Sequence, residues 1–272
     1  MIRDITIGQY YPADSVIHKL DPRVKLFGVV IYVISLFTFR GIWGFLLVTL
    51  ALAAMIKISK VPFRFMVKGL KAIVIILIIT AMFNLFLTPG ETLVTIWKIK
   101  ITKEGLKSAV FMAIRLIYLI LGTSTLTLTT TPNQLTDGME KAFRPLNHIH
   151  VPVHEVAMMM SIALRFIPIL MEETDKIMKA QEARGADFES GNILDRAKAL
   201  IPILVPLFVS AFRRANDLAM AMEARCYRGG EGRTKMKPLF YDKRDYTAYG
   251  VFALYIAFII AAGILGGRYL PV

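Results

Sequence analysis

Apolar runs of membrane length alternate with charged segments along this chain. Four such runs lie in its first half and one near its end: 24–39, 42–58, 72–87, 106–128 and 246–267. Some are shorter than the ~20 residues that a helix needs to cross the bilayer core, but flanking residues can complete them. The pattern predicts an all-α membrane protein with about five transmembrane helices.

The segment 131–245 has a different pattern. It holds two further apolar patches, at 156–170 and 199–212, but the first contains Arg165 and Pro168 and the second is followed at once by two arginines. Apolar stretches of about 10–14 residues are more often buried or interfacial helices than membrane spans. We therefore predict that this segment lies outside the membrane, with seven spans as the alternative count.

Start and stop signals divide this segment into three helices. Thr-Pro at 131–132 predicts the start of a short amphipathic helix that ends at Arg-Pro, 144–145. A second helix is expected over 154–184, bent or restarted at Pro168, and a third over 203–225. Both longer helices carry Ile-Pro-Ile-Leu near their start and end on Glu-Ala-Arg. They therefore resemble a rough internal duplication. Counted from Ile-Pro-Ile-Leu to the arginine, the copy at 201–225 is about two turns longer than the copy at 167–184.

Composition supports the membrane assignment. Of the 272 residues, 56% are hydrophobic and 19% are charged, and the mean hydropathy is +0.56, which is unusual for a soluble domain. The polar first segment lacks the apolar core of a cleavable signal peptide, so the first apolar run is expected to act as the insertion signal. The single cysteine, Cys226, excludes an internal disulfide and argues against a Cys/His metal cluster.

The distribution of positive charge predicts the orientation in the membrane. The net charge is +13. With the N-terminus inside, 26 of the 33 Lys and Arg residues are cytoplasmic: 4 up to the start of the first run, 5 in 57–71 and 17 in 131–245. This asymmetry follows the positive-inside rule. Topology therefore accounts for the charge, and we expect no nucleic-acid partner.

The two longer helices end on nearly the same sequence, AQEARG at 180–185 and AMEARC at 221–226. An arginine in the last turn of a helix can simply complement the helix dipole, and Gly185 alone is an ordinary C-cap. The dipole accepts Lys or Arg, however, and does not require the repeated Ala-x-Glu-Ala before it. A planar guanidinium suits recognition of carboxylates or carbonyls in a pocket. Two copies therefore suggest two similar pockets on a pseudo-symmetric partner.

These motifs carry a resemblance to a known family. The chain is similar to the transmembrane T components of energy-coupling factor transporters, in the broader CbiQ-like family, through SVIHKLDPRVKL (15–26), TTPNQLTDGMEKAFRPL (130–146), the pattern of spans and the two Ala-Arg motifs. That family has an Ala-Arg-Gly-type tripeptide at the end of each of two long cytoplasmic coupling helices. Ala183-Arg184-Gly185 matches it directly. Ala224-Arg225-Cys226 departs at the third position, where the family varies.

The resemblance implies a non-catalytic subunit of an ATP-driven importer of vitamins or transition-metal ions. Its partners would be two ABC-type ATPases, identical or different, and a small membrane-embedded S component that binds the substrate. In such proteins the coupling helices cross, and each arginine-bearing end contacts one ATPase. This chain would bind no cofactor itself, since ATP and magnesium are used by the ATPases. The ATPase contacts implied are Ala183, Arg184, Gly185, Ala224, Arg225 and Cys226.

The resulting organisation has four parts in the cytoplasmic membrane. Residues 1–23 form a cytoplasmic N-terminal segment, 24–130 hold transmembrane helices 1–4, 131–245 form a cytoplasmic domain of three coupling helices, and 246–272 hold the last span and a short outside tail. The third residues of the two motifs differ, Gly185 against Cys226, and the expected helix lengths differ as well. Both differences favour two different ATPases over two copies of one.

Several other residues are candidates for function. Nine of the 14 methionines lie in 131–245. Met158, Met159 and Met160 fit either core packing or an adaptable contact with S components. Arg115 lies near the middle of the fourth run, where intramembrane charges are often functional, and has no assigned role. The histidines at 148, 150 and 154 lack metal-ligand spacing, so we expect no metal site. The charged run 242–245 is expected to be exposed.

The alternatives come from other classes of membrane protein. A self-contained secondary transporter is the second hypothesis, but it predicts inverted repeats with paired intramembrane charges. A membrane enzyme would require clustered acidic or histidine side chains, and we identify no catalytic residue. An ordinary ABC permease carries one coupling element per membrane half, whereas this chain carries two. A phosphate-binding G-x-x-x-x-G-K-[ST] motif is absent from the sequence, so the chain is not itself the ATPase.

Overall fold

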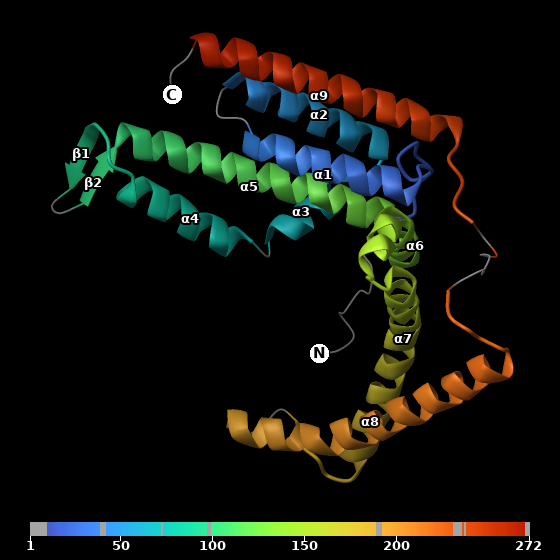
Figure 1. Ribbon diagram of the computed structural model, residues 1–272. Coiled ribbons are helices and arrows are strands. Elements are labelled where there is room, and N and C mark those ends of the chain that lie inside the picture. Colours follow the sequence, from blue (N-terminus) through green and yellow to red (C-terminus); the bar gives the residue numbers. More distant parts are fainter. Residues whose placement is uncertain are drawn as a thin grey trace. The chain divides into compact units, whose positions relative to one another are not determined.

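The computed structural model describes residues 10–38, 42–71, 73–96, 99–188, 192–230, 236 and 238–269. The chain divides into two compact units, one made by residues 139–238 and the other by 8–138 together with 239–272. Helices dominate both units (Figure 1), which confirms the predicted all-α membrane protein.

The membrane-type unit is built around one long helix, α5 (Lys103–Thr129), which contacts α1 (Pro22–Thr38), α2 (Ile42–Ser59), α3 (Phe63–Lys71) and α4 (Val74–Leu87). The last helix, α9 (Lys243–Tyr269), packs along α1 and α2 (Figure 1). A short hairpin of β1 (Thr92–Ile96) and β2 (Ile99–Thr102) precedes α5. This hairpin was not predicted from the sequence.

Side-chain hydrogen bonds mark the starts of two helices, and the second of these confirms the start predicted at 131–132. Asp21 caps α1, since its Oδ1 accepts the backbone N–H of Arg23 at 2.9 Å. Thr131 caps α6 (Pro132–Phe143) by accepting the N–H of Gln134, whose side chain accepts the Thr131 N–H in return. This reciprocal pair is a capping box.

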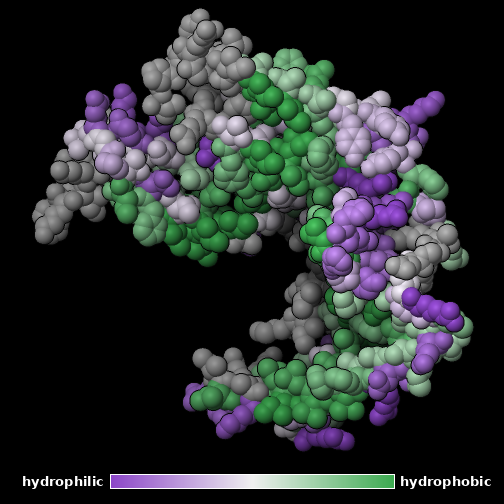
Figure 2. Space-filling view, viewed as in Figure 1, coloured by the Kyte–Doolittle hydropathy of each residue, from purple (hydrophilic) through white to green (hydrophobic). Residues whose placement is uncertain are grey.

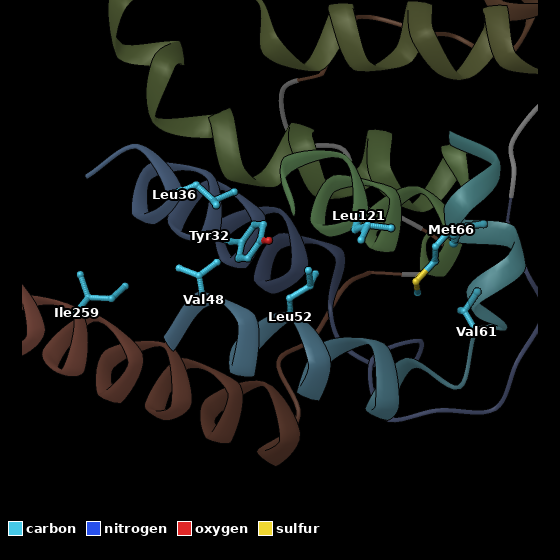
Figure 3. Close-up of a cluster of buried hydrophobic side chains, with 9 residues drawn as sticks. Tyr32, Leu36, Val48, Leu52, Val61, Met66, Leu121 and Ile259 are labelled. Carbon is cyan, nitrogen blue, oxygen red and sulfur yellow. The ribbon is translucent and has the colours of Figure 1, made fainter. Parts of the chain in front are cut away.

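A cluster of buried side chains joins α1, α2, α3, α5 and α9 (Figure 3). Tyr32 lies at its centre with 4% of its surface exposed, and its hydroxyl donates to the carbonyl of Tyr118 at 2.9 Å. Gly122 leaves room for the Tyr32 ring, because a Cβ at that position would overlap it. The labelled members are Tyr32, Leu36, Val48, Leu52, Val61, Met66, Leu121 and Ile259.

The other unit contains the short 3-10 helix η2 (Arg144–Ile149) and two long helices, α7 (Val153–Ala183) and α8 (Ile193–Ala224). α7 runs without interruption through Pro168, so of the predicted bend or restart at this residue the restart is wrong. α8 starts ten residues before the expected position and includes both Pro202 and Pro206. Figure 1 shows α8 bent along its length, and proline removes a helical hydrogen bond and commonly bends a helix.

Length and composition identify three helices in the described residues that could cross a membrane: α5, α7 and the Lys198–Ala224 part of α8. α3 and α4 meet the criterion together as a bent pair, with an angle of 63°. Gly44–Ser59 of α2 is a shorter apolar helix. The criterion therefore includes α7 and α8, which the sequence pattern placed outside the membrane.

Candidate functional site

The end of α7 carries the first Ala-Arg motif on a well-defined turn. Arg184 is the C-cap residue, and Gly185 follows with φ +88°, in the left-handed region. The Gly185 N–H donates to the Glu182 carbonyl at 2.9 Å, and the Ala186 N–H donates to the Gln181 carbonyl at 3.0 Å. These two bonds form a Schellman motif, which satisfies the last free carbonyls of the helix.

The end of α8 has the same geometry. Arg225 is its C-cap residue, and Cys226 follows with φ +56°. The Cys226 N–H donates to the Glu223 carbonyl at 2.8 Å, and the Tyr227 N–H donates to the Met222 carbonyl at 3.0 Å. A left-handed conformation is uncommon for a residue other than glycine. The departure from Ala-Arg-Gly therefore changes the residue but not the turn.

We call Ala183, Arg184 and Gly185 the α7 tip, and Ala224, Arg225 and Cys226 the α8 tip. All six residues are solvent-exposed. Within the part of the chain that the structure describes, neither tip arginine has an ion pair or a hydrogen bond from its guanidinium. Each tip therefore presents a charged planar group at the end of a helix, where a partner could bind it.

A carboxylate on α7 joins the two long helices where they contact one another. Oε1 of Glu173 accepts the Ser210 hydroxyl at 2.6 Å, and Oε2 accepts Nη2 of Arg214 at 2.6 Å. Both acceptors are part-buried, and charge-assisted bonds of this kind are stronger than neutral ones. The pair fixes the point at which α7 and α8 meet in Figure 1.

This contact point lies at the same sequence distance from both tips. The tip arginines are 41 residues apart in sequence, and Glu173 and Arg214 are also separated by 41. Glu173 and Arg214 are therefore equivalent positions in the duplicated helices, and each lies about 16 Å along its helix from its own tip. The contact between the two helices thus joins equivalent positions of the duplicated sequence.

The predicted difference in helix length is wrong. α7 has 31 residues and α8 has 32. The shared Ile-Pro-Ile-Leu suggested the difference, because its copies at 167–170 and 201–204 are 34 residues apart whereas the tips are 41 apart. Both copies lie inside helices and mark no helix start. The argument from helix length for two different ATPases therefore no longer holds.

The methionine triplet lies near the start of α7. Met158 is half-buried, whereas Met159 and Met160 are 58% and 42% exposed. α8 is more apolar on its surface, and the lower part of Figure 2 shows a hydrophobic stretch over it. Its exposed large apolar side chains are Leu194, Leu200, Ile201, Leu204, Val205, Phe208, Val209, Phe212 and Met220.

Arg115 lies among aromatic side chains within the membrane-type unit. Its guanidinium carbon is 5.8 Å from the centre of the Phe37 ring and 5.7 Å from that of Phe45. Such distances permit cation–π attraction. Phe37 is next to the last residue of α1, so Arg115 stands close to the end of that helix.

The three histidines do not gather around one point in a way that suggests a ligand set. His154 pairs with Glu140, with Nδ1 and Oε1 2.9 Å apart. No group of three or more His, Cys, Asp or Glu side chains that could hold a metal ion occurs in the described residues.

Comparison with known proteins identifies the family. The CbiQ family model, described as a cobalt transport protein, matches residues 13–236. The chain belongs to this family. It is 58% identical to a protein of Clostridium kluyveri over 250 residues, covering 91% of this chain and 93% of the relative. It is 52% identical to one of Ruminiclostridium cellulolyticum over 260 residues, covering 96% and 97%.

A Bacillus subtilis relative is 49% identical over 246 residues, covering 90% of this chain and 93% of its own length. All three carry the name energy-coupling factor transporter transmembrane protein EcfT. The predicted resemblance is thus confirmed. This CbiQ-family chain is a transmembrane component of an energy-coupling factor transporter, a multi-subunit membrane complex, and its kinship with transport subunits implies a non-catalytic role.

The sequence pattern missed a buried polar network at the start of α1 and α9. Asp245, expected to be exposed, has only 2% of its surface exposed. Its Oδ1 accepts the Asp21 N–H at 2.9 Å and its Oδ2 accepts the Asp242 N–H at 2.8 Å. One carboxylate therefore caps α9 and fixes it to the start of α1.

Lys25 is the second buried charge of this region, with 6% of its surface exposed. Its Nζ donates to the carbonyls of His18 at 3.1 Å and Thr129 at 2.9 Å. The signal available in the sequence was a lysine in the first turn of a mostly apolar helix, because a cation there requires hydrogen-bond acceptors once it is buried.

Proposed function

We propose that this chain is the coupling subunit of an ATP-driven importer of vitamins or transition-metal ions. Two ABC-type ATPases would each receive one tip, and a separate membrane-embedded S component would bind the substrate. The observation that carries the proposal is the pair of tips: two exposed arginines on identical turns, each at the same distance from one helix crossing.

The shared geometry supports two similar binding partners. A guanidinium presents its donors as a planar fork that matches carboxylate or carbonyl acceptors in a groove. The alanines at 183 and 224 and the turn residue after each arginine let a partner backbone approach closely, since they carry small side chains. Two ATPase subunits related by a twofold axis would offer such grooves in pairs.

The crossing supports a mechanism for transmitting motion. Closure of the ATPases on ATP would bring their grooves together and move the two tips with them. Because Glu173 joins Ser210 and Arg214 where the helices meet, displacement of the tips would turn α7 and α8 about that point. The exposed apolar face of α8 and the side chains of Met159 and Met160 would pass this movement to the S component.

We place α7 and α8 on the cytoplasmic side and propose five spans. If both helices crossed the membrane in turn, Arg184 and Arg225 would lie on opposite faces, and two equivalent tips would then serve no common partner. The positive-inside asymmetry favours the same arrangement. Arg115 would contribute to the packing of α1, α2 and α5 and would have no direct part in coupling.

Co-purification and uptake test the proposal. The tagged chain is expected to bring down ABC ATPases and a small membrane protein, and Arg184→Glu/Arg225→Glu should lose the ATPases and transport. Arg213→Glu, an exposed arginine on α8 away from the tips, is the matched control and should retain both. Normal ATPase recovery and uptake by the double variant would contradict the proposal.

A further inference from the structure

An apolar cavity of about 360 Å³ opens within the membrane-type unit, between α1, α2, α5 and α9. Its volume is within the range of small-molecule sites. The lining comes from helices that are distant in sequence but converge at the start of α1. It is almost wholly apolar and includes Val29, Ala54, Met55, Leu126, Val251 and Phe252.

A polar hollow of about 470 Å³ adjoins this cavity, and Val16, Ile58 and Arg244 line both. Among the described residues, the hollow is also lined by three lysines, Lys19, Lys57 and Lys60, against a single carboxylate, Asp14. The four cations come from the segment before α1, the end of α2 and the start of α9. The fold therefore gathers them at one mouth of an apolar cavity.

The charges at this mouth are only partly compensated. Lys19 pairs with Asp14 at 2.6 Å. The pKa of the Asp14 carboxyl is lowered, first by the hydrogen bond from Lys19 and then by its charge, with smaller effects of Lys60 and Arg244. Arg244 lies 3.7 Å from an oxygen of Asp242, and both side chains are more than half exposed. An excess of positive charge therefore faces the hollow.

The backbone at Lys60 adds a second observation. Lys60 follows the last residue of α2 with φ +55°. Glycine or asparagine is the usual residue at such a left-handed position, and a side chain there costs about 1 kcal/mol. A lysine at this position places a cation at the mouth in spite of that cost.

We propose that this cavity binds an anionic phospholipid. An acyl chain would occupy the apolar cavity, and the headgroup phosphate would lie among Lys57, Lys60 and Arg244. Basic pockets at the cytoplasmic ends of membrane helices suit such headgroups, and the cytoplasmic leaflet supplies anionic lipids. A soluble anion would use the cations but not the cavity, and an apolar helix would use the cavity but not the cations.

Native mass spectrometry of the full-length chain tests this proposal. Phosphatidylglycerol and phosphatidylcholine with the same acyl chains are supplied together, and the lipid retained is measured. Wild type should retain one phosphatidylglycerol in preference to phosphatidylcholine. Neutralising Lys57, Lys60 and Arg244 with glutamine should lower this retention by about fivefold for each charge removed.

Three further variants separate binding from folding. Lys60→Gly should lower phosphatidylglycerol retention while leaving the thermal stability equal or higher, because it removes the charge and the backbone strain together. Ala54→Phe should fill the cavity and lower retention without changing any charge. Arg64→Gln, on α3 and outside the lining of both hollows, is the matched control and should behave as wild type.

Four results would overturn the proposal. These are equal retention of the two lipids by wild type, undiminished retention by the triple variant, undiminished retention by Ala54→Phe, and displacement of the lipid by glycerol 3-phosphate at the same concentration. The last would indicate a soluble-anion site. Loss of the ATPases or of transport plays no part in this readout, so the lipid site and the coupling function are tested separately.

Discussion

Replacing Gly185 by alanine is expected to loosen the last turn of α7 by about 1 kcal/mol. Gly185 has φ +88°, and a Cβ built there would meet nothing within 4 Å. The cost is therefore conformational, because alanine disfavours the left-handed region, and steric overlap adds nothing. The Schellman bonds from Gly185 and Ala186 should open more often as a result.

The reciprocal change at the other tip should have the opposite sign. Cys226 already has a side chain at φ +56°, so Cys226→Gly removes strain from the end of α8. The gain should be smaller, about 0.5 kcal/mol, because glycine also increases the entropy of the unfolded chain.

Amide hydrogen exchange measures both changes at the residues concerned. If exchange follows local opening, lowering the stability of the turn by about 1 kcal/mol makes exchange about fivefold faster. In Gly185→Ala this applies to the amides of residues 185 and 186. Exchange at the α8 tip should become slower in Cys226→Gly by about twofold. Shifts of the same sign in both variants, or no shift in Gly185→Ala, would refute the shared turn geometry on which the two-tip argument depends.

Three other changes, with one control, test the packing. Asp245→Ala should lower the free energy of unfolding in detergent by about 2–3 kcal/mol, since two buried N–H groups lose a charged acceptor; an unchanged melting temperature would contradict this. Gly122→Ala should destabilise by about 1–3 kcal/mol because the new methyl overlaps Tyr32. Gly250→Ala is the control and should not destabilise the protein, because a Cβ added at this position meets nothing within 4 Å. Glu173→Ala should broaden the distribution of distances between spin labels at the two tips, and an unaltered distribution would show that the Glu173 hydrogen bonds do not fix the crossing.

Local signals predicted the helix ends well. Thr131 before a proline proved to be an N-cap with the expected side-chain bond. The ends of α7 and α8 followed from Glu-Ala-Arg, because a C-cap is formed by residues within one turn of each other. Such features need no knowledge of the tertiary structure.

Features that depend on distant residues were not predictable from one sequence. The burial of Asp245 requires α9 to pack beside the start of α1, more than 200 residues away. The partner of Glu173 is 41 residues away on another helix. The third helix was predicted to begin at 203, just after Pro202, whereas α8 begins at Ile193 and continues through both Pro202 and Pro206.

The most direct test of the central claim uses the only cysteine of the chain. A photo-crosslinker on Cys226 reports what contacts the α8 tip in the assembled transporter, and the exchange Gly185→Cys/Cys226→Gly moves it to the equivalent place on the α7 tip. The account predicts that both positions crosslink to an ABC ATPase. Crosslinks from either tip to lipid, or to no protein, would contradict it.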